Sequence, residues 1–113
     1  MKHLKTLETI NDGPKIGDYI IVKSNSPIYE INDFIENNIG QIFNIVKFKN
    51  SRYGNTYYTK YNNIPSEIKV YFQYLMLENK LCYYRGYDSS SIIEYSKNKE
   101  NLEIILQAKK YNL

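Results

Sequence analysis

Short segments rich in β-branched and aromatic residues, separated by turn-forming residues, run through most of this chain. Segments of this length and composition favour β-strands over helices. They lie at 19–23, 41–49, 56–61, 81–85 and 92–95, with breaks that contain Gly, Pro, Asn or Ser. Because the chain has 113 residues, it is expected to form one domain with a single, predominantly β core.

Apolar residues at helical spacing predict three helices among these strands. The first covers about 30–36, and the second begins at Pro65 and continues to about residue 75. Their apolar faces would consist of Ile31, Phe34 and Ile35 in the first and of Ile68, Phe72 and Leu75 in the second. The third helix is 98–110, where Ser96 or Asn98 can cap the first turn. We therefore predict a small β-rich barrel with a C-terminal helix packed on it, preceded by an N-terminal arm at 1–14.

Strand alternation assigns side chains to faces, because successive residues of a strand point to opposite sides. In 56–61, one face holds Tyr57 and Tyr61 and the other holds Tyr58 and Lys60. In 41–49, one face holds Ile42, Val46 and Phe48 and the other holds Phe43, Ile45, Lys47 and Lys49. Only some of the tyrosines can therefore reach the surface.

Residues suited to catalysis or metal binding are few. The chain has one Cys, Cys82, and one His, His3, which excludes an internal disulfide and a zinc site built from several Cys and His ligands. Cys82 lies in an apolar, aromatic strand and is expected to be a small buried hydrophobe, whereas His3 is expected to be a mobile surface residue. The five glycines are dispersed and form no phosphate-binding loop. The sequence thus predicts no enzyme, no cofactor and no metal site.

The densest acidic set consists of Glu30, Asp33 and Glu36, spaced by three along a predicted helix. This spacing places the three carboxylates on one stripe, which is expected to face solvent. The surrounding residues lack the alternating ligands and the glycine of a calcium-binding loop.

The strongest candidate for ligand binding is the hairpin at 47–61. No acidic residue occurs between Asn37 and Ser66, while four cations give that stretch a charge of +4, against +3 for the whole chain. Tyrosines are interleaved with these cations, and a second such cluster follows at 83–87. The predicted binding residues are Lys47, Lys49, Arg52, Tyr53, Tyr57, Tyr58, Lys60, Tyr83, Tyr84, Arg85 and Tyr87. Alternatively, the inward tyrosines belong to the core and the lysines only keep the hairpin soluble.

These features support two functions. Tyr and Arg are favoured at the centres of protein interfaces, and the 13 tyrosines exceed what so small a domain can hide. We therefore predict a non-catalytic module that binds a protein partner, as an adaptor or inhibitor. The alternative is a nucleic-acid-binding barrel, in which the hairpin cations neutralise phosphates and its rings stack on bases. No apolar run approaches the ~18 residues of a membrane span, so the protein is expected to be soluble and cytoplasmic, without membrane contact.

Several fragments carry a resemblance to a known group of proteins: 15–22 (KIGDYIIV), 38–42 (NIGQI), 58–65 (YTKYNNIP), 95–102 (YSKNKENL) and 109–113 (KKYNL). In these fragments the chain resembles small uncharacterised SH3-like barrel proteins of AT-rich phages and large DNA viruses. The resemblance covers most of 15–113 and implies an SH3-like β-barrel with short connecting helices and a C-terminal helix. It also implies a virus-encoded protein that binds a host or viral protein in the cytoplasm of an infected cell. Since SH3-like barrels serve many functions, the fold by itself does not supply the activity.

Overall fold

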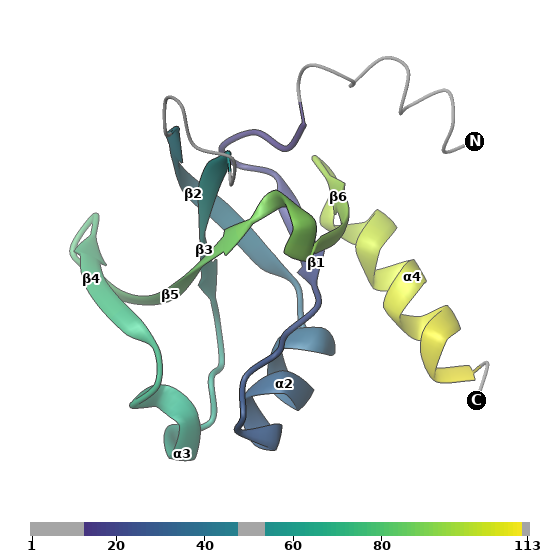
Figure 1. Ribbon diagram of the computed structural model, residues 1–113, viewed down its shortest axis with the longest axis horizontal. Helices are drawn as coiled ribbons and strands as arrows, with labels where there is room; N and C mark the ends of the chain where they lie inside the picture. Colours follow the sequence, from purple (N-terminus) through teal and green to yellow (C-terminus); the bar gives the residue numbers. More distant parts are fainter. Residues whose placement is uncertain (1–12, 48–53, 112–113) are drawn as a thin grey trace.

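In the computed structural model, which describes residues 13–47 and 54–111, six antiparallel strands form one open sheet (Figure 1). The strands are β1 (Tyr19–Val22), β2 (Gly40–Lys47), β3 (Asn55–Tyr61), β4 (Gln73–Leu77), β5 (Lys80–Asp88) and β6 (Ile92–Ser96). Their order across the sheet is β4-β5-β3-β2-β1-β6, so that β4 and β6 form its edges. The helices are α2 (Tyr29–Glu36), α3 (Ser66–Lys69) and α4 (Lys99–Tyr111), with a short 3-10 turn η1 (Ser89–Ser91) between β5 and β6. The predicted α+β class is confirmed.

Most predicted elements are present close to their predicted positions. The Asn98 side chain caps α4, since its oxygen accepts a hydrogen bond of 2.9 Å from the backbone N–H of Glu100. The second predicted helix is too long, because α3 ends at Lys69 and Gln73 already pairs with Tyr84 in the sheet. Of the predicted N-terminal arm at 1–14, residues 1–12 lie outside the described part of the chain.

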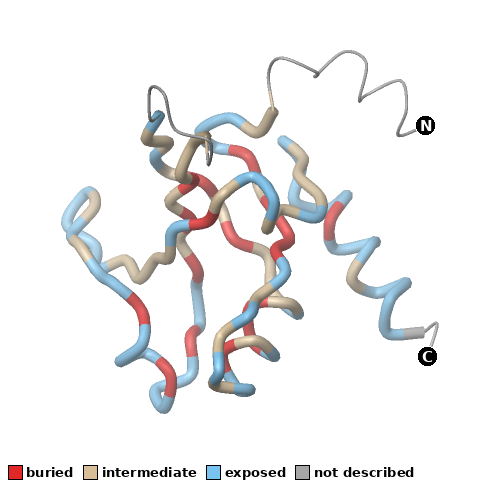
Figure 2. Tube along the Cα trace, in the orientation of Figure 1, coloured by how far each residue is buried: buried red, intermediate tan, exposed pale blue. Residues whose placement is uncertain are grey.

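The core lies between α2 and one face of the sheet, which we call the inner face. Buried residues lie along the central strands and on α2 (Figure 2). The cluster consists of Ile20, Val22, Ile31, Phe34, Ile35, Ile42, Tyr57, Tyr61, Ile64, Ile68, Phe72 and Tyr87. Helix α4 contacts β6 and β1 and buries Leu102, which is 1% exposed. Burying an aliphatic side chain of this size contributes about 1.5–3 kcal/mol, so each of these contacts matters to a small domain.

A β-bulge in β2 changes which of its residues face the core. Ile42 pairs with Thr59, but Asn44 pairs with Tyr58, so that Phe43 is an extra residue opposite β3. After the extra residue the alternation restarts, and Ile45 packs against the core on the same face as Ile42. The prediction that Ile42 and Ile45 lie on opposite faces is therefore wrong for β2. The predicted faces of β3 are confirmed, since Tyr57 and Tyr61 are buried while Tyr58 and Lys60 are half-buried on the other side.

Two buried tyrosines are joined by a hydrogen bond in the core. The Tyr61 hydroxyl donates to the Tyr87 hydroxyl at 3.1 Å, and the two side chains are 4% and 8% exposed. Burial raises the pKa of both phenols, that of Tyr61 well above its usual value, because a phenolate would lose its hydration. Tyr87 raises the pKa of Tyr61 further, whereas the hydrogen bond from Tyr61 and the nearby Arg85 partly offset the increase in the pKa of Tyr87.

Gly40, the first residue of β2, leaves no room for a side chain. A Cβ at this position would lie 2.9 Å from the Tyr61 ring and even closer to the methyl group of Thr59. We expect Gly40→Ala to lower the free energy of unfolding by about 1–3 kcal/mol through overpacking, as measured by urea denaturation. Gly86→Ala is the matched control: its Cβ would meet the Thr56 methyl group and the Tyr58 ring at 3.1 Å, farther than the contacts at Gly40 and with half-buried side chains, so a smaller loss is expected. Equal losses in the two variants would contradict this interpretation.

The tyrosine pair makes stability depend on alkaline pH. Both pKa values are raised above the unfolded-state value of about 10, so the stabilisation is complete below about pH 10 and is lost as the pH rises through the folded-state values. We expect the free energy of unfolding, measured by urea denaturation across this range, to fall above about pH 10. The fall should be smaller in Tyr61→Phe/Tyr87→Phe. Tyr29→Phe, at a ring that is 73% exposed, should leave the fall unchanged, and a double variant that behaves like the original chain would disprove the assignment.

Candidate functional site

The residues predicted to bind a partner do not form a single surface. Tyr57 and Tyr87 are 5% and 8% exposed and belong to the core, so their rings are not available to a ligand. Lys49, Arg52 and Tyr53 lie outside the described residues. The others divide between the two faces of the sheet: Tyr58, Lys60 and Tyr84 on the outer face, away from α2, and Lys47, Tyr83 and Arg85 on the inner face.

On the outer face, three rings form a cluster across β2, β3 and β5. The Phe43 and Tyr84 rings are 5.3 Å apart at 81°, and the Tyr58 and Tyr84 rings are 5.8 Å apart at 77°. Both arrangements are edge-to-face contacts, which aromatic rings prefer. We call Phe43, Tyr58 and Tyr84 the outer aromatic cluster. Lys60 pairs with Tyr84 across the strands and places a cation next to the cluster.

Arg85, a predicted binding residue on the inner face, is engaged within the chain. The Arg85 guanidinium lies 5.5 Å from the centre of the Phe72 ring and donates a hydrogen bond of 3.2 Å to the backbone oxygen of Tyr71. The Lys69 ammonium lies 5.3 Å from the centre of the Tyr83 ring. These contacts fix the segment between α3 and β4 against β5.

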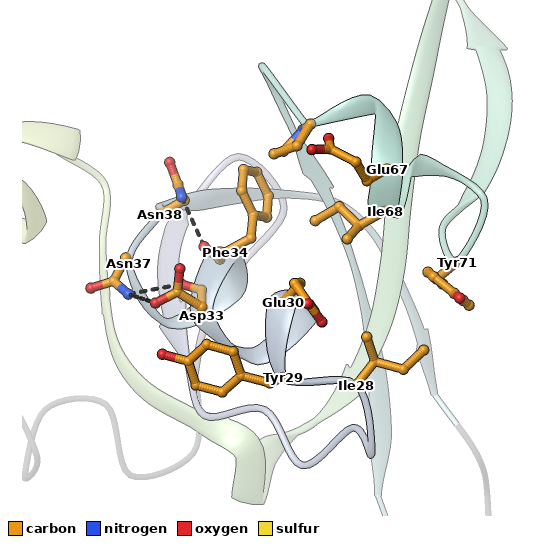
Figure 3. Close-up of a pocket in the computed structure, with 11 residues that line it drawn as sticks. Ile28, Tyr29, Glu30, Asp33, Phe34, Asn37, Asn38, Glu67, Ile68 and Tyr71 are labelled. Carbon is orange, nitrogen blue, oxygen red and sulfur yellow. Dashed lines mark hydrogen bonds between the residues drawn. The ribbon is translucent and has the colours of Figure 1, made fainter.

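A groove between α2 and α3 is a feature that sequence reasoning missed (Figure 3). Its volume is about 550 Å³, within the usual range for binding pockets. Helix α2 exposes this side because Ile31 and Ile35 on its other side are buried in the core. The residues lining the groove are Ile28, Tyr29, Glu30, Asp33, Phe34, Asn37, Asn38, Pro65, Glu67, Ile68 and Tyr71.

The groove has an apolar floor and an acidic rim. Phe34 and Ile68, which are 8% and 4% exposed, line its interior from the two helices (Figure 3). The exposed carboxylates of Glu30, Asp33 and Glu67 surround them, and no Lys, Arg or His is among the described residues that line the groove. The rim therefore carries three formal negative charges without a cation beside them in the lining.

Amide side chains hold the end of α2 along this groove. The Asn37 amide donates to the backbone oxygen of Asp33 at 2.8 Å and to its carboxylate at 3.2 Å. The Asn38 amide donates to the backbone oxygen of Phe34 at 2.8 Å. Both amides satisfy carbonyl groups that the end of a helix would leave without partners. Figure 3 shows these bonds beside the groove.

The predicted acidic stripe on α2 is divided by the fold. Glu30 and Asp33 line the groove, but the Glu36 carboxylate accepts a hydrogen bond of 3.0 Å from the backbone N–H of Ser24 on another side of the helix. The three carboxylates thus do not form one solvent-facing stripe. Within the described residues, no three His, Cys, Asp or Glu side chains come together in a way that could hold a metal ion.

The predicted burial of Cys82 in the core is also wrong. It is half-buried in β5, where it pairs with Leu75 of β4, and is not a core residue. The reason is that Cys82 shares the outer face of the sheet with Tyr84, whereas the core lies between α2 and the inner face. His3 lies outside the described residues.

The sequence contains only weak signals for the groove. The helical spacing in 30–36 correctly separates Phe34, which faces the core, from Glu30 and Asp33. However, Glu67, Ile68 and Tyr71 come from a part of the chain more than thirty residues away, and nothing local indicates that they lie beside α2. Alternation places Phe43 on the face opposite Ile42, but its contact with Tyr84 could not be foreseen.

Among the described residues, none of the helices has both the length and the apolar character needed to cross a membrane. In comparisons with protein-family models, curated proteins and solved structures, this chain matches none of them.

Proposed function

We propose that this protein is a non-catalytic binding module that holds a segment of a partner protein in the groove between α2 and α3. The observation that carries the proposal is the combination of an apolar floor with three carboxylates on the rim. An apolar side chain of the partner would enter between Phe34 and Ile68, and a neighbouring Lys or Arg would meet the rim. The segment recognised would therefore be both basic and apolar.

Two exposed rings support a protein as the ligand. Tyr29 and Tyr71, which are 73% and 49% exposed, line the groove from α2 and from the residues after α3. Tyrosine contributes contact area at low cost in conformational entropy and is enriched among the residues that dominate binding at protein interfaces. A nucleic acid is disfavoured here, because the rim carboxylates would repel its phosphates.

The proposal extends to the barrel type and the origin of the protein. An SH3-like barrel is supported by the strand order, in which β1, β2 and β3 are successive neighbours and β6 returns to pair with β1. A virus-encoded adaptor or inhibitor, acting in the cytoplasm of an infected cell, is supported by the sequence resemblance described above.

The groove should discriminate peptides by charge. We expect short labelled peptides with Lys or Arg beside Leu or Phe to bind in the micromolar range by fluorescence anisotropy, and peptides with Glu in place of the cations to bind much more weakly. Glu30→Gln/Glu67→Gln should weaken binding about five- to thirtyfold, since each partly exposed ion pair contributes up to about 1 kcal/mol.

The control for this measurement is Glu100→Gln/Glu103→Gln. It removes the same charge from exposed positions on α4, outside the groove, and should leave the affinity unchanged. Equal binding of the basic and acidic peptides, or equal effects of the two double variants, would argue against the groove as the binding site.

A second candidate function is single-stranded nucleic-acid binding on the outer face. It is favoured by the outer aromatic cluster with Lys60 beside it. Its weakness is that the three rings pack against one another and are only half-exposed, which leaves little free ring surface for a base.

This alternative makes a different prediction. If it holds, labelled oligonucleotides should bind at low salt and lose affinity steeply as salt rises. Tyr58→Ala should then lower the affinity about five- to 150-fold, the equivalent of about 1–3 kcal/mol of stacking, and Tyr29→Ala in the groove should have no effect. The absence of binding at low salt would exclude this function.

A further inference from the structure

We propose that two copies of this chain join edge to edge through β4, forming an antiparallel pair about a two-fold axis at Leu75. This inference is independent of the groove and rests on the edge of the sheet. Strand β4 pairs with β5 on one side, and no described strand lies on its other side. Figure 1 shows the β4–β5 hairpin extending away from the rest of the sheet.

This edge lacks the features that normally prevent strand pairing between molecules. Natural edge strands carry Lys or Pro, or are covered by another element. Strand β4 has the sequence Gln-Tyr-Leu-Met-Leu, without a charge or a proline. Its hairpin exposes three large apolar side chains, Tyr74 at 67%, Met76 at 62% and Leu81 at 51%. The opposite edge is different, because β6 contains Glu94 and contacts α4.

The backbone of β4 presents two residues to a partner. The hairpin turn consists of Glu78 and Asn79, which have φ values of 50° and 66°, the conformation of a two-residue turn. Such a turn makes the flanking Leu77 and Lys80 a hydrogen-bonded pair, and bonded and non-bonded pairs then alternate along the hairpin. It follows that Tyr74 and Met76 direct their N–H and C=O groups away from β5, toward the free edge.

The outward N–H and C=O groups of these two residues can form hydrogen bonds with those of a second copy of the chain. In an antiparallel pair centred on Leu75, Tyr74 of each copy lies opposite Met76 of the other. Both outward-facing residues then form hydrogen-bonded pairs, and Leu75 faces Leu75 across the axis in a non-bonded pair. A shift of two residues in either direction would leave one of the outward residues in each copy without its partner. The edge is thus complementary to itself in one register.

The side chains fit the same register. Tyr74 and Met76 share a face with Tyr83 and Leu81, their partners in β5. Pairing would place each Tyr74 ring beside the Met76 thioether of the other copy, a favourable sulfur–aromatic contact. The two hairpins would then form one continuous apolar face. On the other face Leu75 meets Leu75, and Gln73 meets Leu77, so that no like charges are brought together.

This self-complementarity favours a second copy over a strand of another protein. A closed two-fold pair uses the same surface on both molecules and leaves no unpaired edge at β4. Since five residues on each side form a small interface, we expect a dimer that dissociates on dilution, not a permanent one.

The two-fold axis at Leu75 gives a charge-swap test. Sedimentation velocity should show dimerisation of the unmodified chain as the concentration rises from about 1 µM to about 1 mM. Leu75→Lys and Leu75→Glu each place like charges opposite each other across the axis, and each should weaken dimerisation at least tenfold. An equal mixture of the two variants should dimerise again, because the lysine introduced in one variant would face the glutamate introduced in the other. Ile104→Lys, at a residue of α4 that is 67% exposed, is the control and should dimerise normally.

A second variant tests the same pairing in case the Leu75 variants fail to fold. Because the Met76 N–H points away from β5, Met76→Pro removes a donor that the dimer uses while leaving the β4–β5 hydrogen bonds in place. Circular dichroism should show an unchanged fold, and the variant should be monomeric. The proposal is overturned if the unmodified chain stays monomeric throughout, if folded Met76→Pro dimerises normally, or if the mixture of Leu75 variants fails to associate.

Discussion

Three aromatic rings in the core determine how α2, α3 and the start of β4 are arranged. Phe34 of α2, Tyr61 at the end of β3 and Phe72 just before β4 contact one another edge to face, with ring centres 5.8–6.2 Å apart. To reach this cluster, Phe72 must point inward directly after α3, and the chain turns there instead of continuing as a helix. The same packing brings α3 beside α2 and creates the groove. It also sends β4 outward, as one strand of a hairpin that α2 does not cover.

Charge divides the surface into regions of different chemical character. The carboxylates of Glu30, Asp33 and Glu67 gather around the groove, whereas Lys60 lies with the aromatic rings on the outer face. The overall charge of +3 conceals this separation. An acidic, apolar groove suits a basic peptide, and the uncharged edge of β4 suits another β-strand. A small domain can in this way offer chemically distinct surfaces.

All strands except β4, the C-terminal helix and the faces of β3 could be predicted, because each depends on a pattern within a few residues. Alternation identified Tyr57 and Tyr61 as a pair on one face, and both are buried. The bulge at Phe43 could not be predicted, since an extra residue in β2 is defined only by its pairing with β3. Likewise, Tyr87 resembled a surface tyrosine in the sequence, but it is buried beside Tyr61, its hydrogen-bond donor 26 residues away.

The sequence by itself determined that this chain forms a small α+β domain with short strands, few potential catalytic groups and many tyrosines. Only the tertiary structure decided which tyrosines are exposed, where the carboxylates gather and which strand forms a free edge. The physical reason is that secondary structure follows from local spacing, whereas a groove or an edge depends on distant segments brought together by core packing. Glu30 and Glu67 become neighbours around one groove because Phe34 and Phe72 pack in the same core.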